Sequence, residues 1–171
     1  MKGYIQVYTG NGKGKTTAAL GLTLRAYGAG LSVFIGQFIK SGDYSEIKAL
    51  KVFHDNVTVK QYGEGRFIMG KPSQEDIAAA QKGISELQEI ILSGKYDVVI
   101  MEEINVAVTT GIVELSQVLE ILKNKPENVE IVLTGRGAAP EILEAADLVT
   151  EMLEIKHYMN SGVKGRIGIE K

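Results

Sequence analysis

Ten residues near the start of the chain constrain its fold more than any other stretch. Residues 8–17 read Tyr-Thr-Gly-Asn-Gly-Lys-Gly-Lys-Thr-Thr, after an apolar run at 4–8 and before Ala-Ala-Leu-Gly-Leu at 18–22. The predicted order is therefore strand, glycine-rich loop, helix. Glycine allows the backbone to approach a ligand closely, and the free N–H groups and positive dipole end of the following helix favour an anion. The stretch predicts a phosphate-binding loop.

The end of this stretch matches the P-loop pattern G-x-x-x-x-G-K-[ST]. In that pattern the lysine binds phosphate and the hydroxyl of the last residue binds Mg²⁺. Its first glycine is replaced here by Thr9. We predict that Lys15 is catalytic, that Thr16 is a Mg²⁺ ligand, and that the nucleotide contacts come from Thr9, Gly10, Asn11, Gly12, Lys13, Gly14, Lys15, Thr16 and Thr17. The alternative, a glycine-rich hairpin with lysines present by chance, does not explain the flanking strand and helix.

Strands and helices alternate along the rest of the chain. Apolar runs predict six strands, at 4–8, 32–38, 57–61, 96–103, 129–134 and 148–152. Helical spacing and caps predict helices at 15–29, 45–50, 74–93, 114–124 and 140–146. This alternation favours an α/β fold with a mainly parallel six-stranded sheet and helices on both faces. With the P-loop on the first strand, the expected fold is P-loop NTPase-like (RecA-like), and residues 1–171 are predicted to form a single domain.

Composition limits the classes of partner. The net charge is −2, so no general attraction to nucleic acid is implied. The chain contains no Cys, which excludes disulfides. No apolar stretch reaches the ~18 residues of a membrane span. Because the first strand is expected by Tyr4, we predict no signal peptide and a cytoplasmic location.

Charged residues follow the predicted strands. Glu102 and Glu103 end an apolar strand, where P-loop proteins hold a carboxylate that binds or orients Mg²⁺. Because side chains alternate along a strand, only one can face the metal, and we predict Glu103; a solvated strand end is the alternative. Arg136 follows the fifth strand and is predicted to neutralise phosphate as a catalytic residue, or else to be a surface arginine. Arg25, on the first helix, would reach the nucleotide or pair with a carboxylate.

A second glycine-rich segment follows the third strand. Residues 62–70 read Tyr-Gly-Glu-Gly-Arg-Phe-Ile-Met-Gly, with large apolar side chains at Phe67 and Ile68. The segment is either a poorly packed connector or part of a surface that binds something large and flat, and functional residues favour loops. In the C-terminal tail, Lys156 and His157 either line the site or are structural.

Several motifs together resemble one family. The chain is similar to the P-loop-type cob(I)alamin (corrinoid) adenosyltransferases over residues 4–170. The similarity lies in the modified P-loop with its threonine, and in four later groups of residues: 37–40, 133–136, 147–152, and the tail segments 156–157, 162–164 and 168–170.

This resemblance implies transfer of the 5′-deoxyadenosyl group of ATP to Co(I) of a corrinoid, with release of tripolyphosphate. The substrates would be ATP and a corrinoid such as cobalamin or cobyrinic acid a,c-diamide, with Mg²⁺ as cofactor, a reductase as the source of Co(I), and a homodimer as the assembly. ATP would lie reversed relative to ordinary P-loop ATPases. Phe67 and Ile68 would contact the corrinoid.

The chain departs from the family pattern at three places. The fourth strand ends Glu-Glu where the family usually has Asp-Glu, and residues 65–68 read Gly-Arg-Phe-Ile where the family often has Gly-Phe-Thr-Trp. The N-terminal arm of many members is not expected here. Two other functions stay open from the sequence: a P-loop ATPase or kinase that acts on the γ-phosphate, and a regulatory module that binds corrinoid or nucleotide. Release of tripolyphosphate rather than ADP would distinguish adenosyl transfer from hydrolysis.

Overall fold

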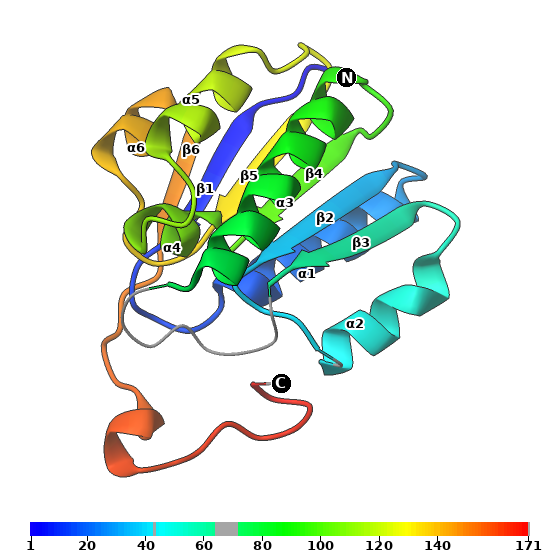
Figure 1. Ribbon diagram of the computed structural model, residues 1–171. Coiled ribbons are helices and arrows are strands. Elements are labelled where there is room, and N and C mark those ends of the chain that lie inside the picture. Colours follow the sequence, from blue (N-terminus) through cyan, green and yellow to red (C-terminus); the bar gives the residue numbers. More distant parts are fainter. Residues whose placement is uncertain (43, 64–71, 171) are drawn as a thin grey trace.

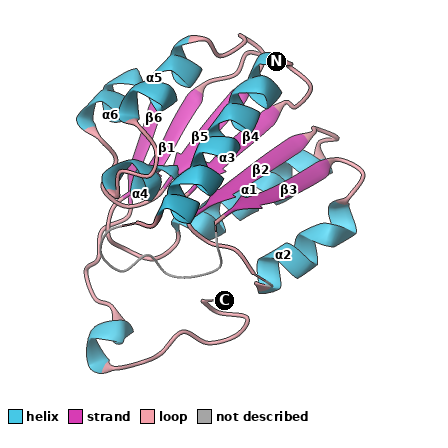
Figure 2. Cartoon of the chain, viewed as in Figure 1, coloured by secondary structure: helices cyan, strands magenta, loops and turns pink. Residues whose placement is uncertain are grey.

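The chain folds around one six-stranded sheet, whose strands are all parallel (Figures 1 and 2). The computed structural model describes residues 1–42, 44–63 and 72–170. The strand order is β3-β2-β4-β5-β1-β6. In chain order the strands are β1 (Ile5–Thr9), β2 (Val33–Phe38), β3 (Val57–Tyr62), β4 (Val98–Glu102), β5 (Glu130–Thr134) and β6 (Leu148–Glu151). The predicted α/β fold with a parallel six-stranded sheet is confirmed.

Helices cover both faces of the sheet, as expected for parallel strands joined by crossovers. One face packs against α1 (Lys15–Gly28) and α2 (Ser45–Leu50), through side chains such as Ala19, Ala26 and Leu50. The other face packs against α3 (Gln74–Leu92), α4 (Ile104–Thr109), α5 (Leu115–Lys123) and α6 (Pro140–Ala145). Figure 1 shows α3 in front of the sheet and α1 behind it.

Local sequence accounts for most of these elements. Helix α3 starts with a capping box, in which the Ser73 hydroxyl accepts from the Asp76 amide and the Asp76 carboxylate accepts from the Ser73 amide. Its buried stripe is Ala80, Ile84, Leu87 and Ile91, as the spacing predicts. Ile77, one turn before Ala80, is 37% exposed.

Two details of the helices differ from expectation. The buried positions of α1 are Lys15, Ala19, Thr23 and Ala26, whereas the larger Leu24 is 58% exposed. Close packing of α1 against the sheet is therefore made by small side chains. Helix α4 was not predicted, because its six residues include four β-branched ones and it begins directly after the left-handed Glu103, with no capping side chain.

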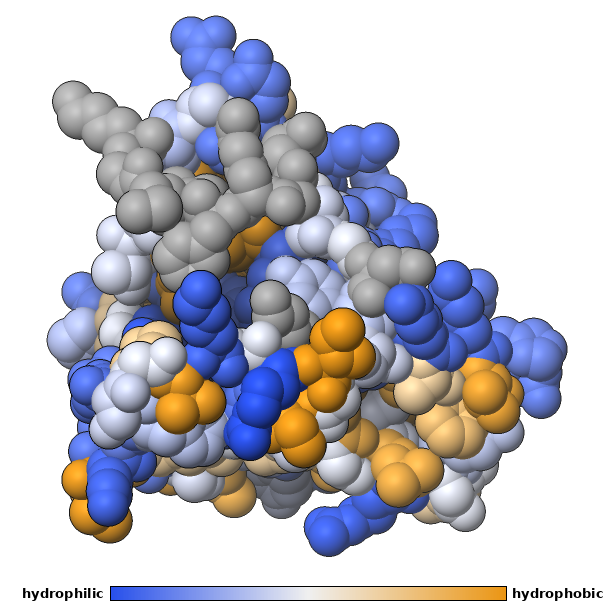
Figure 3. Space-filling view, turned by 90° about the horizontal axis from the view of Figure 1, so that it is seen from below, coloured by the Kyte–Doolittle hydropathy of each residue, from blue (hydrophilic) through white to orange (hydrophobic). Residues whose placement is uncertain are grey.

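The carboxyl ends of all six strands meet at one edge of the sheet, which lies at the bottom in Figure 1. The glycine loop leaves β1 at this edge, and the tail from Leu153 to Glu170 runs below it. Figure 3 looks onto this edge and shows hydrophilic side chains interspersed with hydrophobic ones. Exposed apolar residues of the tail include Leu153, Ile155, Met159, Val163, Ile167 and Ile169. None of the helices in the described ranges is long and apolar enough to cross a membrane.

Candidate functional site

The glycine loop between β1 and α1 is held against the strand next to it. The Gly12 amide donates to the Met152 carbonyl at 2.6 Å, and the Met152 amide donates to the Thr9 carbonyl at 2.9 Å. A Cβ on Gly12 would lie 2.7 Å from the Met152 and Leu153 carbonyl oxygens, so only glycine allows this approach. Thr9, in place of the usual first glycine, is buried and accepts from the Ala138 amide through its hydroxyl.

Helix α1 presents an uncompensated positive end to this loop. Its N-cap is Gly14, with φ of 124°, which makes no side-chain cap, and its first turn contains no acidic residue. The first N–H groups of a helix have no intrahelical partner. The loop therefore offers backbone donors and the positive dipole end to an anion.

The Lys15 side chain folds back over the loop. Its ammonium donates to the Gly10 and Gly12 carbonyl oxygens, each at 2.7 Å, and the residue is only 8% exposed. Burial lowers the pKa of Lys15, and the charge of Arg136 lowers it further. Arg136 is exposed at the end of β5, close enough for its charge to act on Lys15. The structure thus brings these two predicted catalytic residues to one edge.

Thr16 contacts the fourth strand. Its hydroxyl donates to Glu102 Oε1 at 2.6 Å. Val98 and Ile100 of β4 pack on the side of α1, whereas Val99 and Met101 face the other helices. Alternation along the strand therefore directs Glu102, and not Glu103, towards Thr16. This differs from the sequence expectation that Glu103 is the acid on the metal side.

Glu102 is a carboxylate buried to 2% exposure. Burial raises its pKa, and the charge of Lys40 opposes that rise. Its Oε2 atom is buried and has no hydrogen-bond partner among the described residues. A buried acceptor of this kind normally has a partner, and a cation would supply one.

Lys40 is a site residue that the sequence analysis did not select. Its ammonium lies 3.4 Å from Glu102 Oε1 and 3.2 Å from Glu103 Oε1. Burial lowers the pKa of Lys40, but the two carboxylates outweigh it and the net shift is upward. The preceding Ile39 has φ of 66°, a left-handed conformation rare for a β-branched residue, which turns the chain out of β2. In the sequence, a lysine two residues after the end of a buried strand is the feature that could have indicated this site residue.

Glu103 caps α4 in a left-handed conformation, with φ of 59°. Its amide donates to the Thr134 hydroxyl at 3.0 Å, and its side chain is 18% exposed. The bond ties the end of β4 to the end of β5, two residues before Arg136. Strand β5 lies between β4 and β1, so Arg136 starts from a position between the carboxylates and the glycine loop.

The structure does not bring every predicted residue to the site. Arg25 is exposed on α1, and its charge acts on Tyr8, whose hydroxyl bonds to Gln6 near the opposite end of the sheet. Ten residues of helix separate Arg25 from Lys15, which is about 15 Å along the axis. Asn11 and Thr17 are exposed. Phe67 and Ile68 lie outside the described residues.

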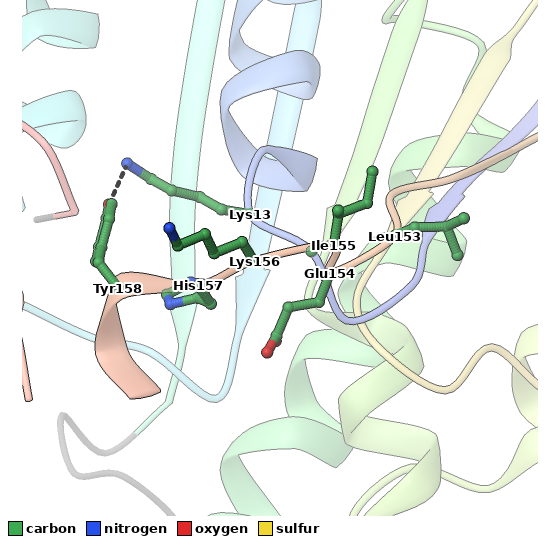
Figure 4. Close-up of a pocket in the computed structure, with 8 residues that line it drawn as sticks. Lys13, Leu153, Glu154, Ile155, Lys156, His157 and Tyr158 are labelled. Carbon is green, nitrogen blue, oxygen red and sulfur yellow. Dashed lines mark hydrogen bonds between the residues drawn. The ribbon is translucent and has the colours of Figure 1, made fainter. Parts of the chain in front are cut away.

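The tail lines a cavity beside the glycine loop. Its walls are Gly12, Lys13 and the six residues 153–158, and its volume is about 220 Å³ (Figure 4). Lys156 and His157, left open from the sequence, are both in this wall. Figure 4 shows Lys13 extending from the loop to the Tyr158 hydroxyl, which its ammonium approaches to 3.3 Å.

Comparison with known proteins agrees with this geometry. The family model described as ATP:corrinoid adenosyltransferase BtuR/CobO/CobP matches residues 1–170. The chain belongs to the ATP:corrinoid adenosyltransferase family. The resemblance inferred from the sequence motifs is therefore confirmed.

Curated relatives match over nearly the whole chain. A corrinoid adenosyltransferase of Pseudomonas aeruginosa is 36% identical over 170 residues, which are 99% of this chain and 84% of that protein. One from Sinorhizobium is 37% identical over 172 residues, 99% and 80% of the two chains. One from Escherichia coli K12 is 34% identical over 169 residues, 99% and 86%.

Among solved structures, a KaiC-like protein from Pyrococcus horikoshii has a similar fold. The TM-score is 0.58 at 10% identity, with 91% of this chain and 74% of that chain covered. This likeness concerns the fold alone, and it agrees with the P-loop class expected from the sequence.

The donor set fits Mg²⁺. Mg²⁺ prefers oxygen ligands and is commonly held by one or two protein groups together with water and substrate phosphates. Thr16 Oγ1 and the Glu102 carboxylate are such oxygens, and Oε2 of Glu102 is a buried acceptor without a partner in the part of the chain that the structure describes. In the ranges that the structure describes, no three His, Cys, Asp or Glu side chains form a metal-binding group. A site built from few protein ligands is the kind that a magnesium–nucleotide complex uses.

Proposed function

We propose that this member of the family transfers the 5′-deoxyadenosyl group of ATP to the Co(I) centre of a corrinoid and releases tripolyphosphate. The observation that supports it most directly is the meeting of the glycine loop, Thr16 and Glu102 at the carboxyl edge of the sheet. This constellation suits a magnesium–triphosphate group, and the family match gives the group that is transferred.

The proposed chemistry needs charge stabilisation more than proton transfer. Co(I) supplies the electron pair for the new cobalt–carbon bond, and the C5′–O bond breaks with its pair going to the tripolyphosphate. The task left to the protein is to hold the 5′ carbon near cobalt and to stabilise the charge that develops on the leaving group.

We assign that task to named residues. Lys15, Lys13 and the free N–H groups of α1 would bind the triphosphate, and Arg136 would add charge from the end of β5. Mg²⁺, held by Thr16 and Glu102, would neutralise phosphate charge. Glu103 stays the second candidate ligand, since it shares Lys40 with Glu102.

Corrinoid contacts by Phe67 and Ile68 stay a prediction from the sequence. The same holds for three expectations from the family resemblance: a homodimer, a reductase that supplies Co(I), and a cytoplasmic location. Arg25 is the weakest of the predicted nucleotide contacts, because its charge acts at the other end of α1.

The test is anaerobic incubation with Mg-ATP and chemically reduced cobalamin. We expect the corrinoid spectrum to change to that of an adenosylated form, with one tripolyphosphate released for each corrinoid consumed. Release of ADP and phosphate without change of the corrinoid would overturn the proposal in favour of a P-loop ATPase.

A further inference from the structure

The P-loop and the tail are joined by a closed cluster of four side chains, Lys13, Tyr158, Arg166 and Glu170. The Lys13 ammonium contacts Glu170 Oε1 at 3.1 Å, the Ile169 carbonyl at 3.1 Å and the Tyr158 hydroxyl at 3.3 Å. All of these partners come from the tail. The Tyr158 hydroxyl also donates to Glu170.

Arg166 binds the same carboxylate with two nitrogen atoms of its guanidinium group. Its Nε and Nη2 atoms lie 3.2 and 3.1 Å from the two oxygens of Glu170, and its backbone amide donates to Glu170 Oε2 at 2.8 Å. Arg166 lies over the Tyr158 ring at 5.1 Å. This bidentate geometry is the one by which arginine also binds phosphate.

The charges of the cluster are not balanced. Two cations, Lys13 and Arg166, share one carboxylate, and the hydrogen bonds from Arg166 and Tyr158 hold the pKa of Glu170 well below its usual range. The cluster therefore has the composition of an anion site in which Glu170 is the anion. The cluster includes a residue of the P-loop itself, because Lys13 lies between the two glycines that precede Lys15.

We propose that Glu170 is an internal substitute for a phosphate group, and that the polyphosphate chain of the nucleotide displaces it and takes over Lys13 and Arg166. The inference rests on the proposed nucleotide site. It adds Arg166, a tail residue outside the P-loop pattern, to the residues that bind phosphate, and it makes the tail respond to nucleotide.

The exchange is physically balanced. One set of charge-assisted hydrogen bonds to oxygen replaces another, so the gain comes from the greater negative charge of the polyphosphate. The cluster is exposed, so each bond is weakened by solvent and salt and can be released. Only molecules in which Glu170 is released can offer both cations to a ligand. The apparent affinity for polyphosphate is therefore the intrinsic affinity multiplied by the fraction of molecules in that released state.

Isothermal titration with tripolyphosphate and Mg²⁺ tests the exchange in the full chain. Glu170→Gln removes the competing charge, with Glu144→Gln, at an exposed acid of α6 outside the cluster and the cavity wall, as the control. Arg166→Gln removes the proposed phosphate contact, with Lys164→Gln as the control for loss of one tail cation. We expect about three- to fivefold tighter binding for Glu170→Gln and a similar weakening for Arg166→Gln, with both controls close to the unmodified chain.

The outcomes separate this inference from the proposed function. Equal or weaker binding by Glu170→Gln would overturn it, because the tail would then only position Lys13. Arg166→Gln that behaves like Lys164→Gln would also overturn it. If Lys15→Ala still weakens binding by about 10- to 100-fold in either case, the P-loop site stands and only the exchange is wrong. If the unmodified chain fails to bind tripolyphosphate, the exchange is wrong, whereas the proposed function is decided separately by the change of the corrinoid spectrum.

Discussion

The Thr16 hydroxyl donates a 2.6 Å hydrogen bond to Glu102, which lies 86 positions further along the chain. The bond joins the first turn of the P-loop helix to the end of β4 across the carboxyl edge of the sheet. It places a hydroxyl and a carboxylate together beside a loop of free backbone donors, in the arrangement that a magnesium–phosphate group requires.

Glu102→Gln should raise the Mg²⁺ concentration needed for nucleotide binding more than Glu103→Gln does. Glu102 is the acid in contact with Thr16, and its second oxygen has no partner among the described residues. Loss of one ligand charge should raise the requirement about tenfold, since ligand or outer-shell changes typically cost 10–100-fold. Titration of Mg²⁺ at fixed ATP measures this. A larger effect for Glu103→Gln would show that Glu103, and not Glu102, is the Mg²⁺ ligand.

Lys15→Ala should weaken Mg-ATP binding by about 10- to 100-fold, because a charge-assisted hydrogen bond to phosphate contributes about 1.5–3 kcal/mol. The melting temperature should change little, because within the described ranges the hydrogen bonds of the Lys15 ammonium are to carbonyl groups of its own loop. Calorimetric titration and thermal unfolding check the two parts. Lys123→Ala, at an exposed position on α5, is the control. A folded Lys15→Ala chain with normal affinity would refute the P-loop interpretation.

The sequence was sufficient for the sheet and for the loop that defines the site. The six strands and five of the helices lie within a few residues of their predicted bounds, because apolar runs, caps and glycines mark them locally. Helix α4 was missed because it starts from a left-handed residue without a cap, a conformation that no local pattern at Glu103 announces.

The local sequence pattern does not decide which of Glu102 and Glu103 contacts Thr16. Alternation predicts that Glu102 and Glu103 point apart, whereas both side chains reach the Lys40 ammonium, since Glu103 lies past the end of β4 in a left-handed conformation. Which acid contacts Thr16 depends on which face of β4 is covered by α1. That is set by packing between Ala19, Ala26 and the strands, far apart in sequence. Lys40 was missed for a related reason, since its approach to both acids depends on the pairing of β2 with β4, in which Gln37 is level with Glu102.

Asp97→Asn should destabilise the fold at neutral pH. Asp97 Oδ2 accepts from the amide and the hydroxyl of Ser32, both at 2.8 Å, which joins the starts of β2 and β4. The Ser32 amide, and then its hydroxyl, lower the pKa of Asp97 below its usual value of 3.8. We expect a loss of about 1 kcal/mol, the difference between a charged and a neutral acceptor.

The pH dependence of this loss has a definite sign. Because the folded-state pKa is the lower one, the stabilisation is present above about pH 3.8 and disappears as the pH falls through the folded-state pKa. Urea unfolding at pH 7 and at lower pH should show the difference between Asp97→Asn and the unmodified chain shrinking with acidification. Asp55→Asn, at an exposed residue, is the control for loss of one surface carboxylate. A difference that grows in acid would contradict the assignment.

Lys40→Met should destabilise the chain in EDTA and be rescued by Mg²⁺. The variant leaves Glu102 and Glu103 close together without the ammonium that lies 3.4 and 3.2 Å from them. Removing one partner of a buried pair costs several kcal/mol, and the 31% exposure of the Lys40 side chain reduces this to about 1–3 kcal/mol, or roughly 3–9 °C in melting temperature. Mg²⁺ would replace the missing charge and should raise the melting temperature more in the variant than in the unmodified chain.

Lys60→Met provides the matched control for that experiment. Lys60 also pairs with a carboxylate, Glu86, but on the outer strand β3 and α3, away from Thr16. Its loss should lower the melting temperature by a smaller amount, with the same Mg²⁺ response as the unmodified chain, because an exposed pair contributes about 0–1 kcal/mol. Mg²⁺ could instead fail to restore the melting temperature of Lys40→Met, or could stabilise both variants alike. Either result would show that the Lys40 ammonium does not occupy the Mg²⁺ position, and that Lys40 acts only as a structural partner of Glu102.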